Sequence, residues 1–203
     1  MNYTDLKALV LSYADREDAE VSDRIDDFIS VVEAKGNRKL KISEMSKRAV
    51  TTTSIAQEYY SLPDDFAGLR DIELRDSLDA ISRTTLQYLP PEQSNKASGV
   101  TNGAFYTIVA NQIQLIPRQD NKLMEVIYYK KIPNLSDINT TTWLSTAYPD
   151  FYVFGLMTEI SSFVKDAEAT ILWGQRFDNL VNEMIANDSI LRWSGTPLQT
   201  TVG

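Results

Sequence analysis

The residues best suited to chemistry in this chain are carboxylates that lie close together in the sequence: Asp64 and Asp65, Asp26 and Asp27, and the acidic run from Asp15 to Glu20. Paired carboxylates can bind a divalent metal or act as an acid and a base. Adjacent residues on a helix do not face each other, which makes Asp26 and Asp27 a poor pair. The other pair follows Pro63, a context typical of a turn. We therefore expect these carboxylates to be solvated or to form turns.

Two residue types that carry much of enzyme chemistry are missing, because the chain has no cysteine and no histidine. Disulfides, thiolate metal sites and the commonest general base are excluded. No glycine-rich phosphate-binding motif occurs either. We predict no catalytic residue, no metal site and no cofactor. The alternative from the enzyme class is a metal-dependent hydrolase that uses Asp64, Asp65 and Asp71.

Composition places the chain among ordinary globular proteins, with 203 residues, 43% apolar and 24% charged. The net charge of −8 argues against a protein that grips nucleic acid through its phosphates. No apolar run is long enough for a membrane span. The first residues lack a basic region and a cleavage site, so we expect no signal peptide.

Helical periodicity occurs at both ends of the chain. Apolar residues recur at helical spacing over residues 4–15, again from Val21 to Val32, and in the last third after Pro149. Asp166 is a suitable start for a last helix that continues to about Leu191. The middle contains short β-branched and aromatic stretches separated by turn signals, which predicts five to six strands.

The expected fold is α+β: a helical bundle, made of an N-terminal hairpin and two long C-terminal helices, with an inserted small antiparallel β-sheet or sandwich and an extended tail. The expected parts are an N-terminal helical hairpin, a β-rich insertion, C-terminal helices that pack on the hairpin, and the tail, with bounds 1–47, 48–133, 134–193 and 194–203.

Two segments have residue types that suit binding. The only strongly basic segment is a candidate partner-facing surface, or the solvated end of a helix: Arg38, Lys39, Lys41, Lys47 and Arg48. Arg192 and Trp193 precede a polar tail without pattern. Because Trp and Arg dominate binding hot spots, this pair is either an anchor for a partner or simple helix-end packing.

The stretch from Trp143 to Phe177 carries the most specific pattern: Trp-Leu, then Tyr-Pro-Asp, an aromatic pair, Gly-Leu and a Glu, followed by Asp, Trp and Phe. It resembles the C-terminal half of bacteriophage head-to-tail adaptor proteins. Further similar segments occur in the same order: Phe28-Ile29, Glu33-Ala34, Asn37-Arg38, Leu40-Lys41, Leu62 to Phe66, Tyr88-Leu89, Pro91-Glu92, Tyr128-Tyr129, Ile132-Pro133 and Leu135 to Asp137. Gly36 departs from the family pattern, and we expect the second helix to weaken or end there.

The resemblance implies a structural virion protein without enzymatic activity, made in the bacterial cytoplasm. Such adaptors form rings, usually of twelve subunits, between the portal protein and the tail or nozzle protein. The ring surrounds the channel through which the genomic DNA leaves, without binding it specifically. The C-terminal arm docks on the portal, which in this chain implies a portal-binding set: Arg192, Trp193, Pro197, Leu198 and Gln199. The alternative within the virion is a tail-completion or neck protein that contacts a tail tube.

Overall fold

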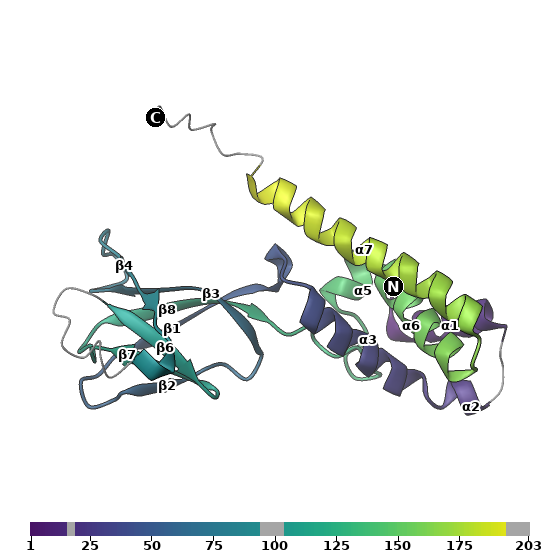
Figure 1. Ribbon diagram of the computed structural model, residues 1–203, viewed down its shortest axis with the longest axis horizontal. Coiled ribbons are helices and arrows are strands. Elements are labelled where there is room, and N and C mark those ends of the chain that lie inside the picture. The colour runs from purple at the N-terminus through teal and green to yellow at the C-terminus, as the bar shows by residue number, and fades with distance from the viewer. Residues whose placement is uncertain (16–18, 94–103, 194–203) are drawn as a thin grey trace. The chain divides into compact units, whose positions relative to one another are not determined.

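The computed structural model describes residues 1–15, 19–93 and 104–193, and the chain divides into two compact units (Figure 1). The first, the helical unit, contains Met1–Glu44 together with Ile132–Gly203. The second, the β unit, is the continuous segment Met45–Lys131. The chain therefore leaves the helical unit once, builds the β unit and returns.

Six α-helices occur in the described part of the helical unit: α1 (Tyr3–Ala14), α2 (Ala19–Ser22), α3 (Ile25–Lys39), α5 (Trp143–Ala147), α6 (Pro149–Phe163) and α7 (Ala167–Trp193). Figure 1 shows α7 as the longest of them, and it packs against α6. None of these helices has both the length and the apolar composition that a membrane crossing requires.

Local sequence signals explain where several of these helices begin. The Asn2 side chain accepts a hydrogen bond of 2.8 Å from the Asp5 N–H at the start of α1. Pro149 occupies the first turn of α6, where its missing N–H is harmless. At the start of α7, the Asp166 carboxylate accepts a hydrogen bond of 3.0 Å from the Ala169 N–H. The predicted start of the last helix is confirmed.

Two glycines allow close helix packing rather than ending a helix. The helix does not end at Gly36, the second of the two expected outcomes, because α3 continues to Lys39. A Cβ atom on Gly36 would lie only 2.8 Å from side-chain atoms of Ile132 and Phe151. On Gly155 it would lie 2.6 Å from Val32. The missing side chains bring α3 and α6 together, which offsets the helix propensity that glycine costs.

Two polar side chains of α3 hold the chain where it re-enters the helical unit. The Asn37 Oδ1 atom accepts a hydrogen bond of 2.7 Å from the Ile132 N–H. One turn earlier, Glu33 Oε1 accepts bonds of 2.8 Å from the Leu135 N–H and 3.0 Å from the Tyr152 hydroxyl. Glu33 is only 3% exposed. The two residues thereby satisfy backbone donors that have no strand or helix partner; we call them the α3 clasp.

The β unit contains eight strands in its described residues: β1 (Ser46–Thr52), β2 (Tyr59–Ser61), β3 (Phe66–Arg75), β4 (Thr84–Thr85), β5 (Gln87–Tyr88), β6 (Phe105–Val109), β7 (Gln112–Ile116) and β8 (Leu123–Lys130). They form two four-stranded sheets with the orders β1-β8-β3-β4 and β2-β7-β6-β5. One core contains residues of both sheets, among them Ile72 and Val126 from the first and Ile113 and Leu115 from the second.

The expected architecture, a helical bundle with a small inserted antiparallel sheet, is wrong. The protein is α+β with two complete sheets, and the second is mixed because β5 and β6 pair in parallel. The β content was underestimated for two physical reasons. The register of β3 shifts between Phe66 and Gly68 and between Leu69 and Asp71, which disturbs the alternation of buried and exposed residues. In addition, β4 and β5 have two residues each, too few for any pattern.

The α3 clasp generates a prediction for the pH dependence of stability. Burial raises the pKa of Glu33 above its ordinary value, and the hydrogen bonds from Leu135 and Tyr152 only partly oppose this. The folded state therefore binds the Glu33 proton more tightly than the unfolded state does. The resulting contribution to the free energy of unfolding is fully present at a pH below the Glu33 pKa of the unfolded chain. This contribution is lost as the pH rises through the Glu33 pKa of the folded protein.

We expect Glu33→Gln, which keeps an acceptor oxygen, to remove this dependence. The measurement is the free energy of unfolding in urea for both proteins from pH 4 to 8. The wild-type value minus the variant value should fall as pH rises. A difference that is constant or that rises with pH would contradict the assignment.

Candidate functional site

Of the carboxylates singled out in the sequence, Asp26 pairs with Lys7 at 3.2 Å in the helical unit, whereas Asp65 and Asp71 make separate contacts within the β unit. Asp65 accepts a hydrogen bond of 2.7 Å from the Tyr128 hydroxyl and pairs with Lys47 at 2.8 Å. Burial opposes ionisation of Asp65, but these two partners lower its pKa overall. The Asp71 carboxylate accepts from the N–H of the next residue, Ile72, at 2.8 Å. Throughout the described ranges, no three acidic side chains gather as a metal site would require.

The basic segment is divided between the two units, and most of its cations have partners in their own unit. Lys39 pairs with Asp178 and lies 5.7 Å from the centre of the Phe177 ring. The Lys41 ammonium donates a 2.7 Å bond to the Asn37 carbonyl, and burial lowers the Lys41 pKa. In the β unit, Lys47 pairs with Asp65 and Arg48 with Glu125. Arg38, in the last turn of α3, is exposed.

Arg192 holds the end of α7 on its own unit. Its guanidinium pairs with Asp188 at 2.8 Å and donates to the Ser43 hydroxyl at 3.0 Å and the Lys41 carbonyl at 3.3 Å. Asp188 also accepts a 2.8 Å bond from the Ser43 N–H. Long-range polar contacts therefore fix the last turn of the helix. The side chain of Trp193 and the residues Pro197, Leu198 and Gln199 lie outside the described residues.

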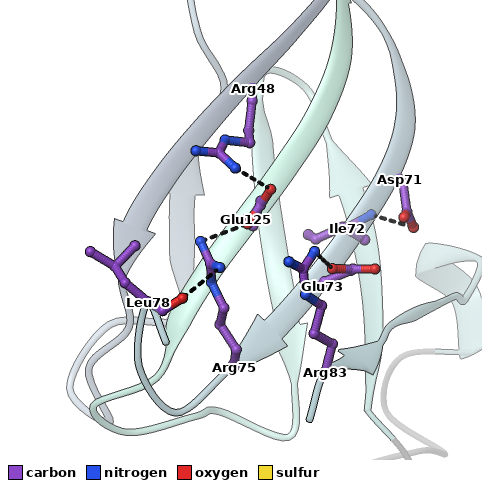
Figure 2. A network of polar contacts seen from close by, with 8 residues as sticks. All are labelled: Arg48, Asp71, Ile72, Glu73, Arg75, Leu78, Arg83 and Glu125. Carbon is purple, nitrogen blue, oxygen red and sulfur yellow. Dashed lines mark hydrogen bonds and ion pairs between the residues drawn. The ribbon is translucent and has the colours of Figure 1, made fainter. Parts of the chain in front are cut away.

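A polar network with a buried centre lies on the first sheet of the β unit, on the face opposite the core residues Ile72 and Val126 (Figure 2). Glu73 on β3 stands directly opposite Glu125 on β8, an unfavourable pairing of like charges. Arginines compensate it: Arg75 approaches Glu125 to 2.7 Å, Arg48 approaches it to 3.3 Å, and Arg83 pairs with Glu73 at 3.0 Å.

Arg75 and Glu125 are the buried centre of this network, with side chains 5% and 3% exposed. Arg75 Nη1 also donates to the Leu78 carbonyl at 3.3 Å, which holds the loop after β3 against the sheet. Among the described atoms, Arg75 Nε and Glu125 Oε2 make no well-aligned hydrogen bond. Charge attraction rather than an aligned hydrogen bond therefore links Arg75 and Glu125. Nothing in this arrangement presents a nucleophile or a free acid to a substrate, and we assign it to stability.

Sequence reasoning missed both the α3 clasp and this network. A signal existed for the clasp: Glu33 lies among the apolar positions of α3, one turn after Ile29. A charged residue on a buried helix face requires a partner. No such signal existed for Glu125, because its place between the core residues Met124 and Val126 puts it on the opposite face of β8, where strand alternation predicts an exposed side chain.

We expect removal of one member of the buried pair to be costly. Glu125→Ala should lower the free energy of unfolding by about 3–5 kcal/mol, because the Arg75 charge would remain buried without its partner. The double variant Arg75→Met with Glu125→Leu should recover most of that loss. Arg48→Ala is the matched control and should cost at most about 1 kcal/mol, since Arg48 is 61% exposed.

Urea unfolding of the four proteins measures these differences. If Glu125→Ala and Arg48→Ala lower the free energy of unfolding equally, the buried pair contributes no more to stability than an exposed contact does.

Comparison with known proteins identifies the family. No curated protein matches the chain. A family model described as "SU10 adaptor protein" matches residues 1–201, which is nearly the whole chain and includes both units. The α3 clasp and the groups that donate hydrogen bonds to it all lie in the segments that resemble adaptors: Glu33, Asn37, Ile132, Leu135 and Tyr152. The chain belongs to the SU10 adaptor protein family, a family of bacteriophage head-to-tail adaptors.

Proposed function

We propose that this adaptor forms a ring, of twelve subunits, between the portal protein and the tail or nozzle protein, and that the ring surrounds the DNA exit channel. The observation that carries this proposal is the family match over residues 1–201. A match that covers both units supports an adaptor function for the whole chain and not for one part of it. The family is a structural one, and the proposal requires no chemistry.

The distribution of charge supports passage of DNA without tight binding. The helical unit has eighteen Asp and Glu residues against ten Lys and Arg, whereas the β unit has ten of each. The net charge of −8 therefore comes from the helical unit alone. A channel wall built from this unit would repel a polyanion and allow it to slide.

Contact with the portal is proposed for the segment that follows α7. Arg192 fixes the end of the helix through Asp188 and Ser43, so the chain beyond it starts from a defined point. Trp193, Pro197, Leu198 and Gln199 then supply the contact. A weak contact of this kind becomes a stable joint when many subunits repeat it, because the effective concentration of each further contact is high.

Deletion of residues 194–203 tests this assignment. Because Arg192 already fixes the end of α7 through Asp188 and Ser43, we expect the circular dichroism spectrum and the melting temperature to stay unchanged. Attachment to purified portal rings of the same phage, measured by co-sedimentation, should be lost. A shorter deletion of residues 200–203 keeps Pro197, Leu198 and Gln199 and should still attach.

If the protein without residues 194–203 co-sediments as the full chain does, the tail is not the portal contact. Binding to a tail tube and not to the portal would instead identify a tail-completion or neck protein.

A further inference from the structure

The strand β1 forms one edge of the first sheet of the β unit. Within the described residues it pairs on one side only, with β8. The Thr53 N–H donates to the Lys122 carbonyl at 2.7 Å, so the backbone groups of every second residue before Thr53 face β8. The groups that face the free edge belong to the residues in between, among them Arg48, Val50 and Thr52. Such an edge is a template for one further strand.

Charge protects only the beginning of this edge. Lys47 and Arg48 are the two charged residues of β1, and both pair with carboxylates of their own unit. Charged residues on an edge strand hinder pairing with another chain. The residues from Ala49 to Thr52 carry no charge and include no proline, and Val50 is 41% exposed. This second half of β1 is therefore the part of the edge that is open to a partner strand.

A mostly apolar groove opens beside the uncharged half of β1. Its volume is about 80 Å³, and Ile113, Met124 and Val126 of the core line it together with residues of β1 and Leu62. Contact of water with these core side chains is unfavourable. The groove suits one short aliphatic side chain, and an added strand directs every second side chain to the same face.

The described part of the chain ends close to the start of β1. Arg192 donates to the Ser43 hydroxyl at 3.0 Å, and the Asp188 carboxylate accepts from the Ser43 N–H at 2.8 Å. Three peptide units join Ser43 to Ser46, the first residue of β1, so their Cα atoms are at most about 11 Å apart. Residues 194–203, which lie outside the described part, span about 34 Å when extended. They are long enough to reach β1 and to run along it.

The composition of residues 194–203 suits an uncharged edge beside an apolar groove. The segment contains no charged residue, and it includes β-branched residues, which favour strands. Leu198, Thr200 and Val202 occupy every second position and would share one face of a strand. Because the segment starts where β1 starts, it would run parallel to β1. If residues 193–196 cover the distance to Ser46, Val202 comes to lie beside Thr51, at the groove.

We propose that residues 198–202 add a parallel strand to the free edge of β1 in the same chain, and that the Val202 side chain fills the groove. Strand addition of this kind gains main-chain hydrogen bonds and one side-chain contact. The tether to Arg192 gives this segment a high effective concentration at β1, which favours it over a strand from another molecule. The inference goes beyond the portal contact proposed above and does not depend on it.

The two contacts exclude each other, because Leu198 and Gln199 cannot bind the portal and β1 at the same time. Attachment to the portal therefore requires release of the strand. A strand of five residues at an edge opens locally at temperatures below those that unfold the sheets. Its loss leaves the melting temperature unchanged, in agreement with the result expected for deletion of residues 194–203.

Amide hydrogen exchange, followed by NMR in the full chain and in the chain without residues 194–203, tests the pairing. The N–H groups of Val50 and Thr52 face the free edge and should exchange at least fivefold faster after the deletion. Ala49 and Thr51 donate to β8 in both proteins, so their unchanged exchange is the matched control. No change at Val50 and Thr52, or an equal change at all four residues, would overturn the proposal.

Disulfide trapping identifies the chain that supplies the strand, because the protein has no cysteine of its own. Val50→Cys and Thr201→Cys lie side by side in the proposed pairing, on the face away from the groove, at a separation that a disulfide spans. The double variant at low concentration should form an internal disulfide under mild oxidation. Adding Val202→Asp places a charge in the groove and should reduce this disulfide at least tenfold.

Thr85→Cys is the matched control, since Thr85 is exposed on β4, the edge strand at the other side of the same sheet. In place of Val50→Cys it should give at least tenfold less internal disulfide with Thr201→Cys. Equal trapping at the two edges would overturn the proposal. Covalent dimers in place of the internal disulfide would also overturn it, because the strand would then come from another copy.

Co-sedimentation of the Val50→Cys, Thr201→Cys protein with portal rings separates this inference from the portal contact. Loss of attachment in the oxidised protein and its recovery on reduction would support both. Attachment of the oxidised protein would support the pairing with β1 and contradict the portal contact of the segment. Attachment of the reduced protein without any internal disulfide on oxidation would overturn the pairing and leave the adaptor function standing.

Discussion

The hydrogen bonds that Glu33 and Asn37 accept from the re-entering chain are the constraint on which the helical unit depends. The chain leaves this unit at Glu44 and returns at Ile132 with the whole β unit in between. On its return, the backbone at Ile132 and Leu135 has donors to satisfy, and one face of α3 provides both acceptors. The Tyr152 hydroxyl adds α6 to the same carboxylate. Two adjacent turns of α3 thereby bind the chain at the point where it returns after an insertion of 87 residues.

The helices could be predicted from the sequence because their signals are local. The helix expected over residues 4–15 is Tyr3–Ala14, and the last helix begins at Ala167 after its cap, Asp166. The sheets could not be predicted to the same degree. The imperfect alternation of Leu69, Ile72 and Leu74 is a real property of β3, caused by two register shifts that only its partner strand reveals. Strands of two residues, such as Thr84–Thr85, carry no pattern at all.

The candidate site shows a second limit of sequence reasoning, since the partner of a charge is set by the fold. Lys39 pairs with a carboxylate 139 residues away, and the carboxylate that Arg48 approaches is 77 residues away. A basic segment that is continuous in the sequence is thus two separate sets of intramolecular contacts. Arg192 follows the same rule, because Ser43 lies 149 residues before it.

The acidic helical unit and the fixed end of α7 agree with the function proposed above, in which the subunit is stable alone, associates weakly and is ordered into a ring by the portal. Native mass spectrometry of the purified protein, alone and after mixing with portal rings of the same phage, tests this account most directly. It predicts a monomer that becomes a ring-sized mass increment, about one copy for each portal subunit. A monomer that leaves the mass of the portal ring unchanged would contradict it.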